Sequence, residues 1–75
     1  MYHAIEFAEP LTLDLEVSRK QPLEKVCIRK GTILRAQIKP YVSETESGPV
    51  EMANLYFENG TTTRGVRFAS FSFVD

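Results

Sequence analysis

Residues 11–18 alternate strictly between apolar and polar side chains, and this pattern constrains the fold more than any other feature of the chain. The apolar positions are Leu11, Leu13, Leu15 and Val17. A β-strand places such side chains on one face, whereas a helix would distribute them around its circumference. No segment carries an apolar stripe at the 3.6-residue helical period. The sequence therefore predicts a strand over residues 11–17, with one face toward water, in a chain that is almost entirely β.

Shorter alternating runs predict further strands at about residues 3–8, 25–29 and 32–39. Pro10 separates the first two strands because it has no N–H to donate. The polar stretch 18–24, which contains Pro22, is expected to be a loop, and Lys30-Gly31 is a turn signal. These breaks predict connections of hairpin length between the strands.

The strand at 32–39 is expected to direct Leu34, Ala36 and Ile38 toward the core, with Arg35, Gln37, Lys39 and Tyr41 on the opposite face. Pro40 is expected to end this strand or to confine it to a sheet edge. Residues 43–49 are the most loop-like stretch of the chain.

Asn59-Gly60 lies between two β-rich runs and predicts a two-residue type I′ hairpin. That turn would set Leu55 opposite Arg64 and Ala53 opposite Val66. One face of the hairpin would then carry the apolar side chains Ala53, Leu55, Phe57, Val66 and Phe68. The apolar positions change from even to odd numbers between Phe68 and Phe71, so a bulge or bend near Ala69-Ser70 is expected.

Together these runs predict six strands, or seven if the last one breaks at the bend. Open sheet edges are a liability in so small a sheet, and closure into a small antiparallel barrel or stacking as a two-sheet sandwich reduces it. The strand pattern, and only the pattern, resembles that of SH3-like and OB-like small barrels. We expect one all-β domain over residues 1–75, either a barrel or a sheet completed by dimerisation.

Cysteine usage and hydropathy indicate the setting of the protein. Cys27 is the only cysteine of the 75 residues, so the chain can form no internal disulfide and offers no structural zinc cluster. A lone thiol favours a reducing, cytoplasmic location. No secretory signal is visible after Met1, and no apolar run approaches the roughly 20 residues that span a bilayer.

The usual catalytic groups are missing from the sequence. His3 and Cys27 could form a nucleophile–base pair only if the first and third strands were neighbours. The carboxylate pairs Asp14/Glu16 and Glu44/Glu46 are expected to be solvated. The glycines are isolated and form no phosphate-binding loop, and no metal-ligand spacing is present. We therefore expect no enzyme, no cofactor, no metal and no small-molecule substrate.

The net charge of −1 conceals a strongly basic middle segment, because residues 19–39 carry seven basic residues against Glu24 alone. Arg29, Arg35, Lys39 and Tyr41 are expected on outward faces of adjacent strands, with Lys25 and Lys30 at their ends. Such a face could hold single-stranded nucleic acid. Alternatively, Asp14 and Glu16 on a neighbouring strand would pair with these cations within the chain.

Protein binding, to another protein or to a second copy, is the function that the sequence favours. The last third of the chain carries more apolar side chains than one small core can absorb, so Tyr56 with Met52, or Val74, should remain outside. Exposed aromatic residues and methionine near arginine are typical of interface cores. The residues expected to contact the partner are Arg29, Arg35, Lys39, Tyr41 and Tyr56, followed by Arg64 and Arg67. Nucleic-acid binding through residues 25–41 is the alternative.

Overall fold

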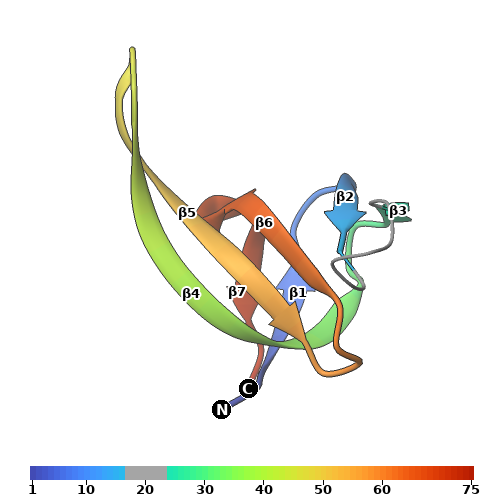
Figure 1. The fold of residues 1–75 in the computed structure, drawn as a ribbon. Coiled ribbons are helices and arrows are strands. Elements are labelled where there is room, and N and C mark those ends of the chain that lie inside the picture. The colour runs from blue at the N-terminus through green and yellow to red at the C-terminus, as the bar shows by residue number, and fades with distance from the viewer. Residues whose placement is uncertain (17–23) are drawn as a thin grey trace.

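The computed structural model describes residues 1–16 and 24–75, and these residues form two antiparallel β-sheets (Figure 1). The elements are β1 (His3–Phe7), β2 (Leu11–Leu15), β3 (Glu24–Ile28), β4 (Ile33–Thr45), β5 (Gly48–Phe57), β6 (Thr62–Arg67), the 3₁₀ turn η1 (Phe68–Ser70) and β7 (Phe71–Phe73). Five strands form one sheet in the order β6-β5-β4-β1-β7, and β2 pairs with β3 in the second. The all-β prediction is confirmed.

The two sheets are joined at one point by hydrogen bonds. The N–H of Glu16 donates to the carbonyl of Thr62 at 2.8 Å, and the N–H of Thr62 donates to the carbonyl of Glu16 at 3.1 Å. This isolated bridge is the only pairing between the sheets among the described residues, so the ladder of hydrogen bonds does not close into a barrel.

The β2–β3 hairpin follows from the alternation described above. Leu13 is buried at 4% exposure, whereas Thr12 and Asp14 face solvent. Asp14 lies opposite Lys25 in the register, which agrees with the expected neighbourhood of acidic and basic residues on these strands. Val17 and the predicted loop at 18–24 fall outside the described residues, except for Glu24, which begins β3.

The hydrophobic core lies between the inner face of the five-stranded sheet and the β2–β3 hairpin. Its buried members are Ile5, Phe7, Leu13, Ala36, Ala53, Leu55, Phe57, Val66 and Phe71. The expected inward positions of β4 and of the β5–β6 hairpin are confirmed, although Leu34, Ile38 and Phe68 are only partly buried. Thr63 is also buried, at 2% exposure, and the apolar pattern gave no signal for it.

The β5–β6 turn differs from the expected type I′ turn. Gly60 alone adopts a positive φ there, of 92°, and no residue other than glycine does so in the described ranges, whereas a type I′ turn needs two such residues. The Phe57 N–H donates to the Thr61 carbonyl at 2.8 Å, which leaves a three-residue loop over 58–60. The side-chain oxygen of Asn59 stabilises this loop, because it accepts hydrogen bonds from the N–H and the hydroxyl of Thr61 at 3.0 and 2.6 Å.

The longer turn shifts part of the register, and a bulge restores the rest. Leu55 lies opposite Thr63 rather than Arg64, but Ala53 lies opposite Val66 as predicted. Between these pairs β6 contains one extra residue, at Gly65, whose φ is 72° and whose N–H donates to the Asn54 side chain at 3.2 Å. The bend expected near Ala69-Ser70 is confirmed, because η1 lies there and precedes the buried Phe71.

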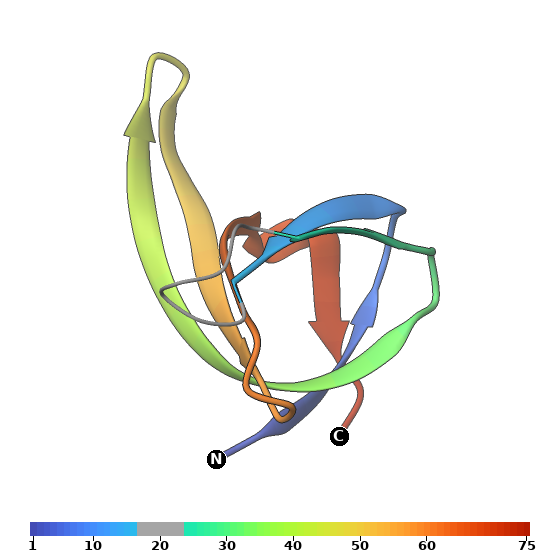
Figure 2. The ribbon, with the colours of Figure 1, turned by 45° about the vertical axis from the view of Figure 1, so that its right-hand side comes forward.

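The prediction of a loop over residues 43–49 is wrong, because β4 continues to Thr45 and β5 begins at Gly48. Only Glu46 and Ser47 form the turn. Gly48 supplies a φ of 109°, and the Thr45 hydroxyl donates to the Gly48 carbonyl at 2.7 Å. Residues 40–51, called the arm below, have no strand partner outside the β4–β5 hairpin in the described part of the chain. The arm projects from the rest of the molecule (Figures 1 and 2).

Pro40 does not end β4, because its nitrogen faces the unpaired side of the strand. Successive residues of a strand direct their backbone groups to alternate sides. The Arg35 carbonyl accepts a hydrogen bond from the N–H of Glu58, just after β5, and the Thr32 carbonyl accepts one from the N–H of Phe7 in β1. The β4–β5 register continues without a shift, so Pro40, like Thr32, points away from β5. β1 pairs with β4 only as far as Ala36, which makes β4 an edge at Pro40.

Pro49 occupies the corresponding position on the other edge of the arm. The Phe57 N–H points to the β6 side of β5, where it donates to the Thr61 carbonyl. Every second residue of a strand points its backbone groups to the same side, so the nitrogen of Pro49 also faces the β6 side. β6 pairs with β5 only as far as Met52, so that side is free of a strand at Pro49. Both edges of the arm therefore carry a proline where an unpaired N–H would otherwise stand, which blocks edge-to-edge pairing.

Replacing Pro40 and Pro49 together with threonine is expected to increase aggregation several-fold while changing thermal stability little. The change gives each free edge an N–H donor and a residue that favours strands. Thioflavin T fluorescence during incubation would measure it, with Pro10→Thr in the β1–β2 connection as the control. Aggregation equal to that of the control would show that the two prolines do not protect the edges.

Candidate functional site

The face of β4, β5 and β6 that points away from the core, called the outer face below, brings together four of the predicted contact residues. Tyr41 lies opposite Met52, and Met52 lies opposite Arg67, so these side chains form a row across three strands. Next to this row the Lys39 ammonium lies 5.6 Å from the centre of the Tyr56 ring, a cation–π contact. Tyr56 and Met52 are half-buried on this face, and neither belongs to the core or to the residues packed against it, as expected.

Tyr41 extends across the sheet toward β6. A Cβ atom on Gly65 would lie 3.8 Å from the Tyr41 hydroxyl, so the ring passes beside the bulge. Tyr41 remains 41% exposed. The outer face thus presents two tyrosines, a methionine and two cations on one continuous surface.

The remaining arginines of the prediction are not part of this group, although Arg35 shares the outward positions of β4 with Lys39. Arg35 forms an ion pair with Glu58, with 3.2 Å between Nε and Oε2, and both side chains are more than half exposed. Arg64 approaches Glu16 at 3.9 Å. Arg29 follows β3, which pairs with β2 in the second sheet. The expected basic face with Arg29 and Arg35 on adjacent strands is therefore wrong, because β3 and β4 belong to different sheets (Figure 2).

The inner face of the arm continues the face that carries the core, and it differs from the outer face in charge. Val42 lies opposite Glu51, and Glu44 lies opposite Pro49. Val42 is 59% exposed. A hollow of about 330 Å³, bounded by Pro40, Tyr41, Val42, Glu51 and Phe68, separates the arm from η1. The acidic residues of the two arm strands thus gather on the inner face, and the Lys39 and Arg67 cations on the outer face.

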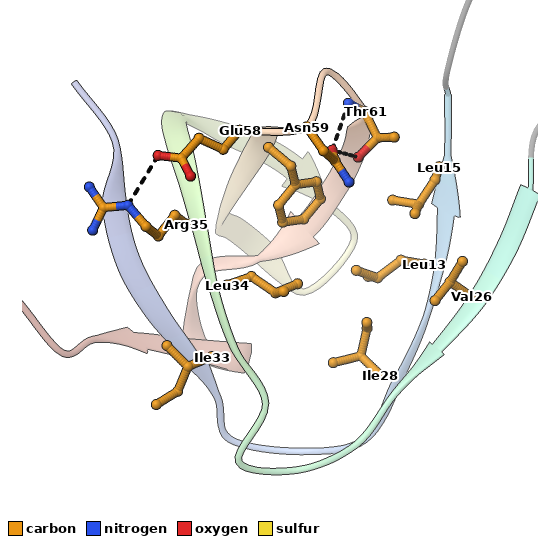
Figure 3. A pocket seen from close by; sticks show the side chains of 11 residues that line it. Leu13, Leu15, Val26, Ile28, Ile33, Leu34, Arg35, Glu58, Asn59 and Thr61 are labelled. Atoms are coloured by element: carbon orange, nitrogen blue, oxygen red, sulfur yellow. Dashed lines mark hydrogen bonds and ion pairs between the residues drawn. The ribbon is translucent and has the colours of Figure 1, made fainter.

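A second hollow, of about 400 Å³, opens between the β2–β3 hairpin and the five-stranded sheet (Figure 3). Leu13, Leu15 and Ile28 point into it from one side and Leu34 from the other. The Arg35–Glu58 ion pair lies at its rim. The sequence carried no direct sign of this hollow. Residues 13 and 15 alternate in one strand and residues 26 and 28 in another, and only the pairing of β2 with β3 places the four on one face.

His3 and Cys27 do not form a catalytic pair. His3 begins β1, where its ring packs edge-on against Phe73 with centroids 5.3 Å apart. Cys27 is exposed on β3, and β1 pairs with β4 and β7 rather than with β3.

The Ala4 N–H donates to the Asp75 carboxylate, and this bond lowers the pKa of Asp75 below its ordinary value.

Residues 1–16 and 24–75 contain no cluster of three or more histidine, cysteine or acidic residues that could hold a metal ion. No helix in these same ranges is long and apolar enough to cross a membrane. No protein-family model, curated protein or solved structure matches the chain.

Proposed function

We propose that the chain is a small, non-catalytic protein-binding module and that its contact surface is the outer face of β4, β5 and β6. The observation that carries the proposal is the row Tyr41–Met52–Arg67 beside the Lys39–Tyr56 contact. Tyrosine, methionine and arginine are enriched at the centres of protein interfaces. Tyrosine also loses little conformational entropy on binding, because its side chain has only two rotatable χ angles.

Charge favours an acidic partner surface. No acidic residue shares the outward positions of residues 37–43, 50–56 and 62–67 with Lys39 and Arg67. Among the described residues, ion pairs join Arg35 to Glu58 and Arg64 to Glu16, and the His3 ring lies 3.7 Å from the Asp75 carboxylate. Neither Lys39 nor Arg67 makes such a contact in this part of the chain. Cations that form no internal ion pair can meet carboxylates across an interface, which steers association and selects the partner.

We also propose that the β2–β3 hairpin completes a small barrel-like arrangement with the five-stranded sheet. Leu13 enters the common core, and the Glu16–Thr62 bridge joins the two sheets at one end. The meander β4-β5-β6, with β1 and β7 paired beyond it, favours the SH3-like over the OB-like pattern. The outer face would then be an outside wall of the barrel, accessible to a large partner.

The double variant Lys39→Glu with Arg67→Glu is expected to weaken partner binding about 100-fold or more, because like charges would meet across the interface. Capture of proteins by the tagged chain from a lysate of its own source, with and without nuclease, measures this loss. The matched control is Arg29→Glu with Lys30→Glu, which makes the same change of charge at the exposed β3–β4 connection.

Each result of this capture has a distinct meaning. A partner protein that resists nuclease, is retained by the control and is lost by the outer-face variant would support the proposal. Equal retention by both variants would remove the outer face from it. Recovery of nucleic acid, with the captured proteins released by nuclease, would favour the nucleic-acid alternative on the same face.

A further inference from the structure

The two faces of the β4–β5 hairpin are complementary to each other in charge and in shape. Successive side chains of a strand point to opposite faces, so the register assigns Glu44 and Glu51 to the inner face and Lys39 to the outer face. Arg67 joins Lys39 on the outer face through its pairing with Met52. The hairpin curves so that its inner face is concave (Figures 1 and 2).

Neither face is neutralised within the chain. The ion pairs of the described residues involve none of Lys39, Arg67, Glu44 and Glu51. Glu44 and Glu51 are exposed. Val42, which lies opposite Glu51, is 59% exposed above the hollow that Phe68 bounds. An exposed branched apolar residue flanked by carboxylates can pack against a surface that offers apolar side chains and cations.

Strand pairing is not the means by which the arm would meet a partner. Pro40 and Pro49 direct their nitrogens to the two free edges, so each edge lacks one backbone donor that an added strand would need. Contact through the faces of the arm therefore remains, and the surface with the matching composition is the outer face, which presents Tyr41, Met52, Lys39 and Arg67.

We propose that the arm is a self-association element, in which the inner face of one copy packs on the outer face of a second copy. Val42 would contact Tyr41 and Met52 of the second copy, and Glu44 and Glu51 would meet its Lys39 and Arg67. This inference rests on the proposed function, because it assigns the partner of the same outer face. Every copy carries both surfaces, so the contact is head-to-tail and can continue into a chain or close into a ring.

Sedimentation velocity of the purified chain over a range of concentrations tests the proposal directly. The wild-type protein is expected to associate with rising concentration and to dissociate as salt screens the charges. Lys39→Glu with Arg67→Glu and, separately, Glu44→Lys with Glu51→Lys are each expected to weaken self-association at least about tenfold. An equimolar mixture of these two variants is expected to associate again, because opposite charges then face each other.

Two controls keep the result interpretable. Arg29→Glu with Lys30→Glu should associate like the wild-type chain, and circular dichroism with thermal melting should show that all variants are folded. Rescue in the mixture is specific to a contact between two different faces. A contact of two outer faces would respond to the first variant alone and would not be rescued.

Three outcomes would overturn the inference. The first is a wild-type chain that stays monomeric at every concentration and at low salt. The second is self-association that is unaffected by Glu44→Lys with Glu51→Lys. The third is a monomeric chain that binds a single-stranded oligonucleotide and loses it with Lys39→Glu and Arg67→Glu. If the wild-type chain stays monomeric but still captures another protein through the outer face, self-association is excluded and the proposed function stands. Failure of this inference is therefore distinguishable from failure of the proposed function.

Discussion

Replacing Phe7 with alanine is expected to lower the free energy of unfolding by about 3–5 kcal/mol, the range observed when a buried aromatic side chain is removed. Phe7 has no exposed surface and is the largest fully buried side chain among the described residues. Its ring packs against that of Phe71 with centroids 6.3 Å apart. Domains are stable by about 5–15 kcal/mol in total, so this loss would remove a large share of the stability.

The position of Phe7 in the sheet adds to the expected effect. Its N–H donates to the Thr32 carbonyl at 3.0 Å, and its carbonyl accepts from the Gly31 N–H at 2.8 Å, so β1 is anchored there to the start of β4. A cavity at this point therefore adjoins the pairing of β1 with both β4 and β7.

Urea unfolding followed by circular dichroism measures the loss, with Phe73→Ala as the matched control. Phe73 lies on the same β1–β7 ladder but is 46% exposed, so its truncation removes less buried surface. Equal losses at the two positions would mean that the core is not centred on Phe7.

Replacing Gly60 with valine is expected to destabilise the protein by about 1–3 kcal/mol, the usual cost of forcing a residue other than glycine into a sparsely populated backbone region. The φ of Gly60 is 92°, and its N–H donates to the Phe57 carbonyl at 3.0 Å to close the β5–β6 turn. A β-branched residue is particularly unfavourable at positive φ. For a chain of this size each kcal/mol corresponds to a fall of about 4–8 °C in the melting temperature.

Two further variants separate backbone strain from the presence of a larger side chain. Apart from its two chain neighbours, no residue has an atom within 4 Å of the place where a Cβ on Gly60 would lie, so the first added carbon meets open space. Gly60→Asn should lose less stability than Gly60→Val, because asparagine tolerates the left-handed region. Glu46→Val, in the turn of the neighbouring hairpin where the φ is not positive, should change the melting temperature little. An unchanged melting temperature for Gly60→Val would contradict the observed turn.

Local pattern predicted most of the strands but not how two of the turns are built. The alternation of residues 11–15 gives β2, and the inward parity of Ala36, Leu55 and Val66 is observed. The residues Asn59-Gly60 could not by themselves distinguish a two-residue from a three-residue loop, because both place Gly60 at positive φ. The stretch 43–49 was predicted to be a loop because its residues are polar. The tip of the β4–β5 hairpin is also polar, because water surrounds it, so polarity does not distinguish the two structures.

Only part of the candidate site could be predicted. Lys39, Tyr41, Tyr56 and Arg67 meet on one face, yet Arg67 joins it only because the extra residue at Gly65 restores the register. Arg29 and Arg35 were expected beside Lys39 because alternation gave all three outward positions on strands that were taken to be adjacent. The sheet order separates Arg29 from them, and Glu58 reaches Arg35 from the end of β5.

The sequence by itself determined the period of each strand and which side chains share a face, because side-chain direction in a strand follows from position alone. It also located the turns at Gly31 and Gly60, because glycine readily adopts a positive φ, whereas Pro40 and Pro49 lie within strands. The tertiary structure alone decided which strands are neighbours and where each strand runs past its partners, because pairing depends on long-range hydrogen bonds and on the packing of the common core. The arm, with its basic outer face and acidic inner face, is the result of that second set of constraints.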